Sequence, residues 1–166
     1  MVTITISIEE GIKIEGRTPF EVKADGFEGV LSRSKAPRYR VYDTDGSLVC
    51  TVKRHFFSNN PFFVVSVPGD LGSVKVSQEM SGFKVSYCIG GRGYSYDEGS
   101  FEQGDIKLTK NGAHVAHLKA HVVAEGVFLV VLEDTDDSDA PWPLGIALAY
   151  GLMLAFLRRT LNNPET

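Results

Sequence analysis

The sequence is poor in cysteine, with only Cys50 and Cys88 among its 166 residues. Two cysteines are too few for a disulfide scaffold, and both lie in alternating apolar runs, which predicts buried, reduced thiols. Positive charge is also scarce, because 17 Lys and Arg residues are outnumbered by 21 Asp and Glu residues, which leaves a net charge of -4. This balance excludes an overall positive field that would hold nucleic acid, so contact with an anionic surface requires a local basic patch.

The sequence also lacks the features of a leader and of a membrane span. The segment Met1 to Glu9 has neither the basic start nor the continuous apolar core of a signal peptide, which predicts a cytoplasmic protein. Only Trp142 to Leu157 could be mistaken for a membrane span. As a helix, these 16 residues would reach roughly 24 Å, short of the roughly 30 Å hydrocarbon core, so no transmembrane span is expected.

Catalytic and cofactor-binding motifs are missing as well. There is no G-x-S-x-G elbow, and neither cysteine has neighbours that would activate a thiol. The glycine-rich run Gly90 to Tyr94 lacks the lysine and serine of a phosphate-binding loop, so it predicts a hairpin loop. These absences favour a protein that is not an enzyme and needs no cofactor, with an enzyme site at one mouth of the fold as a remote alternative.

Two groups of potential metal ligands have unsuitable spacing. His114 and His117 would point to opposite faces of a strand, and His117 and His121 would lie about 13 Å apart, which indicates a solvated face. The acidic stretch Glu133 to Asp139 lacks both the turn glycine and the closing glutamate of an EF-hand. No metal site is therefore expected, and the acids are explained as capping and solubilising residues before a helix.

What the sequence does contain is a series of short β-strand signals. From Val2 to Ile8, apolar β-branched residues alternate strictly with polar ones, the pattern of a half-buried strand. Asp45-Gly46 and Asn111-Gly112 predict type I′ hairpin turns, because these residues tolerate positive φ. Ten or so strands at this spacing predict a sandwich or a barrel. The further runs are Phe20 to Val22, Arg38 to Tyr42, Leu48 to Val52, Phe62 to Val67, Val74 to Val76, Phe83 to Cys88, Ile106 to Leu108, Val115 to Leu118 and Val127 to Leu132.

An internal repeat relates two of the predicted hairpins, so the sheet is expected to consist of two related halves. When the two hairpins are superposed by a shift along the sequence, the apolar residues before the first turn glycine, Tyr39 and Val41, do not fall on those before the second, Ile106 and Leu108. This mismatch indicates a bulge or a one-residue difference between the turns. A shift of 66 positions makes identical residues coincide, namely Gly46 with Gly112, Val49 with Val115, Lys53 with Lys119, His55 with His121, Phe62 with Phe128, and Val64-Val65 with Val130-Val131.

The carboxyl-terminal segment changes character. An acidic loop over about 133–141 leads into a uniformly apolar helix expected over about 143–159, with proline in its first turn and arginines at its negative end. No face of this helix is polar, so it must be enclosed, and enclosure by strands is favoured over enclosure by lipid because the helix is short. Small residues from Gly145 to Ala155 would let the surrounding side chains approach it closely.

These features resemble the LURP-one-related and phospholipid scramblase group of the tubby carboxyl-terminal-domain superfamily. The resemblance covers nearly the whole chain and rests on the run from Tyr39 to Arg54, its echo from Ile106 to Leu118, the strand Phe128 to Val131 and the terminal apolar helix. It implies a mainly β fold of one domain, residues 1–166. In that fold a closed antiparallel β-barrel of about twelve strands, over about 2–132, surrounds a buried apolar C-terminal helix.

For tubby proteins, the resemblance implies phosphoinositide binding through basic residues spaced by two on the barrel surface. That spacing occurs here twice, in Arg33 with Lys35 and in Arg38 with Arg40. Side chains at i and i+2 of a strand point the same way, so two cations could converge on one phosphate. Lys53, Arg54 and His55 form a second basic cluster. Solubilising surface charge is the simpler reading of both groups. The candidate headgroup-binding residues are Arg33, Lys35, Arg38, Arg40, Lys53 and Arg54.

The sequence thus predicts a non-catalytic binding or accessory protein that recognises anionic phospholipid headgroups at the inner membrane surface. The alternative is a protein-interaction or stress-related module without a small-molecule ligand. The lipid hypothesis requires that the basic residues converge on one face despite the negative net charge.

Overall fold

A computed structural model describes residues 1–7, 9–16, 21–25, 38–55, 62–81, 84–97, 105–134 and 141–162. Within these ranges the side chains of 21–25, 78–81, 84–87, 97, 134 and 156–162 are not described. The described elements are β1 (Val2–Ser7), β2 (Gly11–Glu15), β3 (Glu21–Asp25), β4 (Arg38–Tyr42), β5 (Leu48–His55), β6 (Phe62–Ser66), β7 (Val74–Ser81), β8 (Lys84–Gly90), β9 (Tyr94–Asp97), β10 (Asp105–Lys110), β11 (Ala113–Ala124), β12 (Val127–Asp134) and α1 (Pro141–Asn162).

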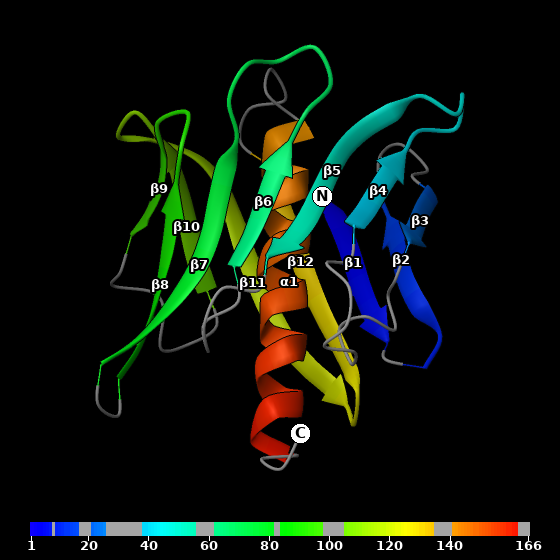
Figure 1. Ribbon diagram of the computed structural model, residues 1–166, viewed down its shortest axis with the longest axis vertical. Coiled ribbons are helices and arrows are strands. Elements are labelled where there is room, and N and C mark those ends of the chain that lie inside the picture. Colours follow the sequence, from blue (N-terminus) through cyan, green and yellow to red (C-terminus); the bar gives the residue numbers. More distant parts are fainter. Residues whose placement is uncertain are drawn as a thin grey trace.

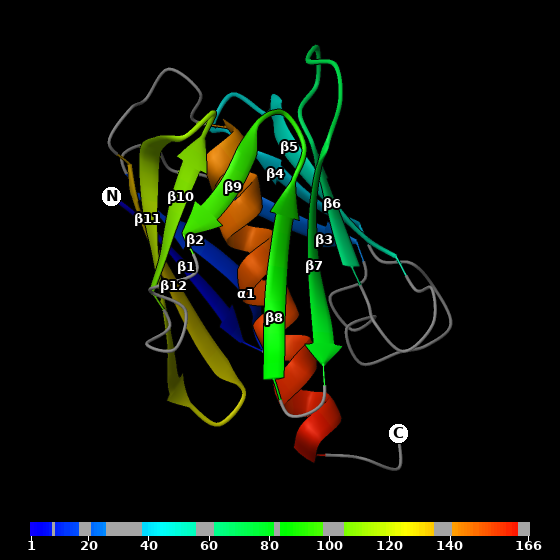
Figure 2. The ribbon, with the colours of Figure 1, turned by 90° about the vertical axis from the view of Figure 1, so that its left-hand side faces the viewer.

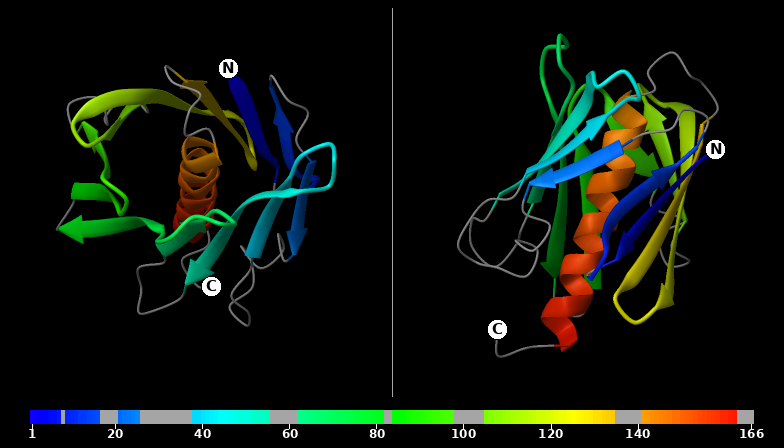
Figure 3. Two further views of the ribbon diagram at one scale, coloured as in Figure 1. Left: turned by 90° about the horizontal axis from the view of Figure 1, so that it is seen from above. Right: turned by 90° about the vertical axis from the view of Figure 1, so that its right-hand side faces the viewer.

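The strands form two antiparallel sheets that surround α1 (Figures 1 and 3). The first sheet has the order β2-β1-β12-β11-β10-β9, and the second sheet has the order β3-β4-β5-β6-β7-β8. The expected closed barrel is not found. Among the described residues, β2 contacts β3 and β8 contacts β9, but neither pair of edges forms a hydrogen-bonded ladder (Figure 2).

The predicted strands are confirmed, and two further strands were missed. Each of the ten predicted regions corresponds to an observed strand. The missed strands, β2 and β9, are the two edges of the first sheet. Each has only two large apolar side chains on its inner face, because an edge strand is short and often carries charged residues. Their periodicity was therefore too weak to predict them.

The helix fills the space between the sheets, as its apolar sequence predicts. Every residue from Trp142 to Met153 is buried. Gly151 shows why small residues are needed, since a Cβ there would lie 2.7 Å from Ile6 Cδ1 and 2.9 Å from Val130 Cγ2. In the described part of the chain, no helix combines the length and the apolar content needed to cross a membrane.

The ends of α1 and β12 differ from the expected boundaries. The helix begins at Pro141 rather than near residue 143, because proline is well accommodated in a first turn, where its missing N–H is not needed. Strand β12 runs through Asp134, so Glu133 lies in the sheet rather than in an acidic loop. Residues 135–140 of that expected loop lie outside the described residues.

The two repeated hairpins are β4-β5 and β10-β11, and the structure explains their misaligned residues. Both hairpins have a register irregularity at the equivalent valine, Val49 and Val115. The turns differ in length, because Tyr42 pairs with Leu48, with five residues between them, whereas Thr109 pairs with His114, with four between them. A turn that is one residue longer therefore shifts β4 relative to β10.

The turns themselves also differ. At Asn111-Gly112 both residues have positive φ, 52° and 85°, as a type I′ turn requires. At Asp45-Gly46 only the glycine has positive φ, so the type I′ prediction is wrong there. The Asp43 carboxylate instead accepts hydrogen bonds from the backbone N–H groups of Asp45 and Ser47, which stabilises the longer turn.

The strands that follow the two hairpins, β6 and β12, are related by a shift one residue longer than the sequence repeat predicts. Phe128 is buried, but Phe62, its partner in the 66-residue shift, is only half-buried on the outer face. In the ladders, Val52 pairs with Val65 and its equivalent Leu118 pairs with Leu132. The shift is therefore 66 for β5 but 67 for β6, and a one-residue slip exchanges the inner and outer faces of a strand.

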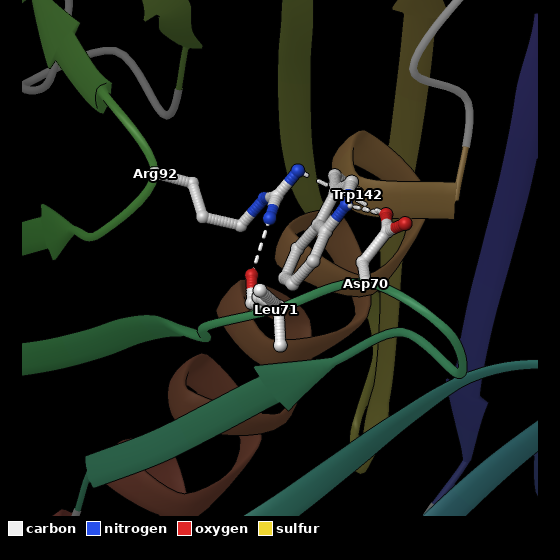
Figure 4. Close-up of polar contacts among 4 residues, drawn as sticks. All are labelled: Asp70, Leu71, Arg92 and Trp142. Atoms are coloured by element: carbon white, nitrogen blue, oxygen red, sulfur yellow. Dashed lines mark hydrogen bonds and ion pairs between the residues drawn. The ribbon is translucent and has the colours of Figure 1, made fainter.

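Two turns meet the start of α1 (Figure 4). The guanidinium of Arg92, in the turn between β8 and β9, lies 4.4 Å from the centre of the Trp142 ring. The same group donates a hydrogen bond to the carbonyl of Leu71, in the turn between β6 and β7. The predicted hairpin loop at 90–94 is thus held against the first turn of the helix.

Candidate functional site

The outer face of the second sheet carries several basic residues, and three neighbouring strands of this sheet carry no acidic ones. Strands β4, β5 and β6 contain no Asp or Glu. Their alternation turns apolar residues such as Tyr39 and Val52 inward and places Arg38, Arg40 and Lys53 on the outer face. We call the outward residues Arg38, Arg40, Lys53, His55 and Lys75 the basic face.

The register of the second sheet aligns three of these cations in one row. Arg38 of β4 pairs with Lys53 of β5, Lys53 pairs with Val64 of β6, and Val64 pairs with Lys75 of β7. Neighbouring strands lie about 4.8 Å apart, so the backbones of Lys53 and Lys75 are about 10 Å apart across Val64. The row thus presents cations on both sides of an apolar position.

An aromatic group adjoins the row. The His55 imidazole is stacked on the Phe62 ring with 4.9 Å between centroids and 3° between planes. The Lys75 ammonium lies 4.2 Å from the centre of the same Phe62 ring. Partial burial lowers the pKa of His55, and the positive charges of Lys53 and Lys75 lower it further.

The first sheet provides a contrast, because two of its outer lysines have acidic partners. Lys13 lies 2.7 Å from Glu15, and Lys119 lies 3.4 Å from Glu133. On the second sheet, within the described residues, no carboxylate forms an ion pair with Lys53 or Lys75. Arg38 is in register with Asp25 of β3, whose side chain is not described. The positive charge is therefore concentrated on one of the two sheets.

The structure brings together three of the six predicted residues. Arg38, Arg40 and Lys53 all lie on the basic face. Arg33 and Lys35 lie outside the described residues. Arg54 does not belong to the site, and that part of the prediction is wrong, because its side chain is 0% exposed.

Arg54 is an interior residue because it continues the inward alternation of Cys50 and Val52. Burial lowers its pKa to about 10 despite the nearby phenol of Tyr39. Burial also raises the pKa of Tyr39 well above its usual range. Both effects follow from the cost of placing charge in a medium of low polarity.

Lys75 is the member of the basic face that the sequence prediction missed. It lies between the buried residues Val74 and Val76, so period-two alternation alone places it on the outer face. Its closeness to Lys53 could not be predicted, because it depends on the register of β5, β6 and β7.

The prediction that both cysteines are buried is only partly confirmed. Cys50 is buried as expected, but Cys88 is exposed, because it lies opposite Ser77 on the outer face while Ile89 points inward. His117 lies 3.9 Å from Asp105. No group of three or more metal-ligating side chains occurs among the residues that the structure describes.

Comparison with known proteins does not extend these observations. No protein-family model, no curated protein and no solved structure matches this chain. The resemblance to the LURP-one-related and phospholipid scramblase group therefore stays a prediction from the sequence pattern.

Proposed function

We propose that this protein is a non-catalytic binding protein whose basic face recognises anionic phospholipid headgroups at a membrane surface. The observation that carries the proposal is the row from Arg38 through Lys53 to Lys75, on a sheet in which strands β4, β5 and β6 contain no acidic residue. A sheet face of this kind can meet a flat anionic surface with several cations at once.

The physical basis is electrostatic attraction added over several residues. Each Lys or Arg near an anionic lipid surface contributes about 1 kcal/mol to binding, and the attraction extends over about a Debye length. The four Lys and Arg residues of the basic face thus provide a usable local attraction even though the net charge of the chain is -4. The sequence resemblance to a lipid-associated superfamily supports the same ligand class.

The test is sedimentation with vesicles of phosphatidylcholine that contain phosphatidylglycerol, compared with vesicles of phosphatidylcholine alone, at low salt. Lys53→Gln combined with Lys75→Gln removes two charges from the basic face. We expect this double variant to bind about 30-fold more weakly, since about 2 kcal/mol is lost. Added salt should weaken the wild-type binding as well.

A matched control removes the same charge from the other sheet. Lys13→Gln combined with Lys107→Gln alters two exposed lysines of β2 and β10. We expect this variant to bind like the wild type. Absence of binding to the anionic vesicles, or an equal loss in both double variants, would contradict the proposed function. A stoichiometric protein partner together with no lipid binding would favour an interaction module instead.

A further inference from the structure

The Phe62 ring lies between a histidine and a lysine. Strands β5 and β7 flank β6, and each brings one side chain to this ring. His55 stacks on it at 4.9 Å, and the Lys75 ammonium lies 4.2 Å from its centre. The faces of a phenyl ring carry negative potential and attract cations, so Phe62 can support a protonated imidazole as it supports the ammonium group.

The charged groups around His55 are mainly cationic. The nearest charged group on its own strand is Lys53, and the nearest on β7 is Lys75. Strand β6 contains no titratable group. Arg38 of β4 lies opposite Lys53, and Cys88 of β8 lies opposite Ser77. Strand β7 also contains Glu79, whose side chain is not described. Protonation of His55 in the free protein therefore adds a charge beside two lysines.

We infer that His55, Phe62 and Lys75 form a proton-dependent subsite of the basic face, which binds an anionic lipid surface more tightly when His55 is protonated. This inference rests on the proposed function of that face. Histidine is the side chain whose charge ordinarily changes between about pH 5 and 8. The subsite thus adds one positive charge to the face as the pH falls.

The direction of the effect follows from linkage. The neighbouring lysines disfavour the imidazolium in the free protein, and bound anionic headgroups compensate for these charges. Binding therefore raises the pKa of His55 and takes up a proton, so affinity increases as the pH falls. One added charge at the lipid surface corresponds to about fivefold tighter binding.

The experiment compares vesicle binding at about pH 7.5 and about pH 5.5, the range over which a histidine titrates. Phosphatidylglycerol is the anionic lipid, because its phosphodiester stays ionised over this range. The variants are His55→Gln, which cannot become charged, and His55→Arg, which is always charged. The control is His121→Gln, an exposed histidine of the first sheet that occupies the position equivalent to His55 in the repeat.

We expect the wild type and His121→Gln to bind about fivefold more tightly at the lower pH. His55→Gln should keep the weaker binding at both pH values, and His55→Arg should keep the tighter binding at both. If His55→Gln gains affinity at low pH like the wild type, the inference is overturned while the proposed function stands. If no variant binds the anionic vesicles at either pH, the proposed function fails and the inference fails with it.

Discussion

The carboxylate of Asp70 accepts a hydrogen bond from the indole N–H of Trp142 over 2.8 Å. The same carboxylate lies 3.9 Å from the guanidinium of Arg92, whose central carbon lies over the Trp142 ring (Figure 4). One acidic side chain therefore joins the first turn of α1 to the turns that follow β6 and β8.

Substitution of Asp70 by alanine should destabilise the fold. The change removes a hydrogen bond to a charged acceptor and leaves the indole N–H without its partner, which typically costs about 1–3 kcal/mol. The measurement is the free energy of unfolding in urea, followed by the fluorescence of Trp142, the single tryptophan. Asp45→Ala, at an exposed turn position, serves as the control and should change the free energy by less than about 0.5 kcal/mol. Equal effects of the two substitutions would contradict a specific role for Asp70.

Stability should fall at alkaline pH because of Cys50. Burial raises the pKa of this thiol to about 12, from an ordinary value of 9.0. The unfolded chain releases the thiol proton at lower pH than the folded chain does, so the stabilisation is complete below about pH 9 and is lost as the pH rises toward 12. Cys50→Ala should reduce this slope of unfolding free energy against pH, and alanine is already the equivalent residue, Ala116, in the other hairpin.

The same environment controls thiol reactivity. In the folded protein a thiol reagent should label the exposed Cys88 and leave Cys50 intact, whereas both should react in concentrated urea. Rapid labelling of two thiols per folded chain would show that Cys50 is accessible. An unchanged alkaline slope in Cys50→Ala would assign the pH dependence to another buried group, such as Tyr39.

Gly151→Ala should destabilise the helix packing although alanine favours helix formation. The added methyl group would meet Ile6 Cδ1 at 2.7 Å, and overpacking of this kind typically costs about 1–3 kcal/mol, which equals or exceeds the roughly 1 kcal/mol gained in helix propensity. Ile6→Val removes the closest atom, so the double variant should be more stable than the sum of the single effects predicts. Thermal unfolding of all three variants tests this coupling.

A glycine with open space around it provides the comparison. Nothing lies within 4 Å of a Cβ built on Gly90, so Gly90→Ala should have little effect on the unfolding temperature. A coupling of zero between Gly151→Ala and Ile6→Val would mean that Val130, rather than Ile6, limits the space beside the helix.

Much of the fold follows from local patterns in the sequence. The strict alternation of β1 and the absence of any polar face on α1 were sufficient to predict a half-buried strand and an enclosed helix, because each pattern has one physical solution. Closure of the strands into a single barrel was not predictable in this way. It depends on whether distant edges come within hydrogen-bonding distance, and β2 and β9 are edges with weak signals of their own.

The candidate site, like the fold, could be predicted only where a local pattern decides the position of a residue. Alternation in β5 assigns Lys53 to the outer face and Arg54 to the inner face, beside Cys50 and Val52, so the periodicity of the strand and not the charge of arginine determines where Arg54 lies. The contribution of Lys75 and the stacking of His55 on Phe62 depend on three-strand register, which no local pattern specifies.

The pairing of β1 with β12 has a consequence for how the chain folds. Val2 is in register with Leu132, so the first strand of the protein reaches its hydrogen-bonding partner only after most of the chain has been synthesised. The second sheet, from β3 to β8, is complete by Gly90 and can form from contacts between successive strands. Long-range pairing of this kind slows folding. The second sheet, which carries the basic face, can therefore assemble first. The N-terminal strand can pair only after β12 has formed, and the core is then completed with the helix.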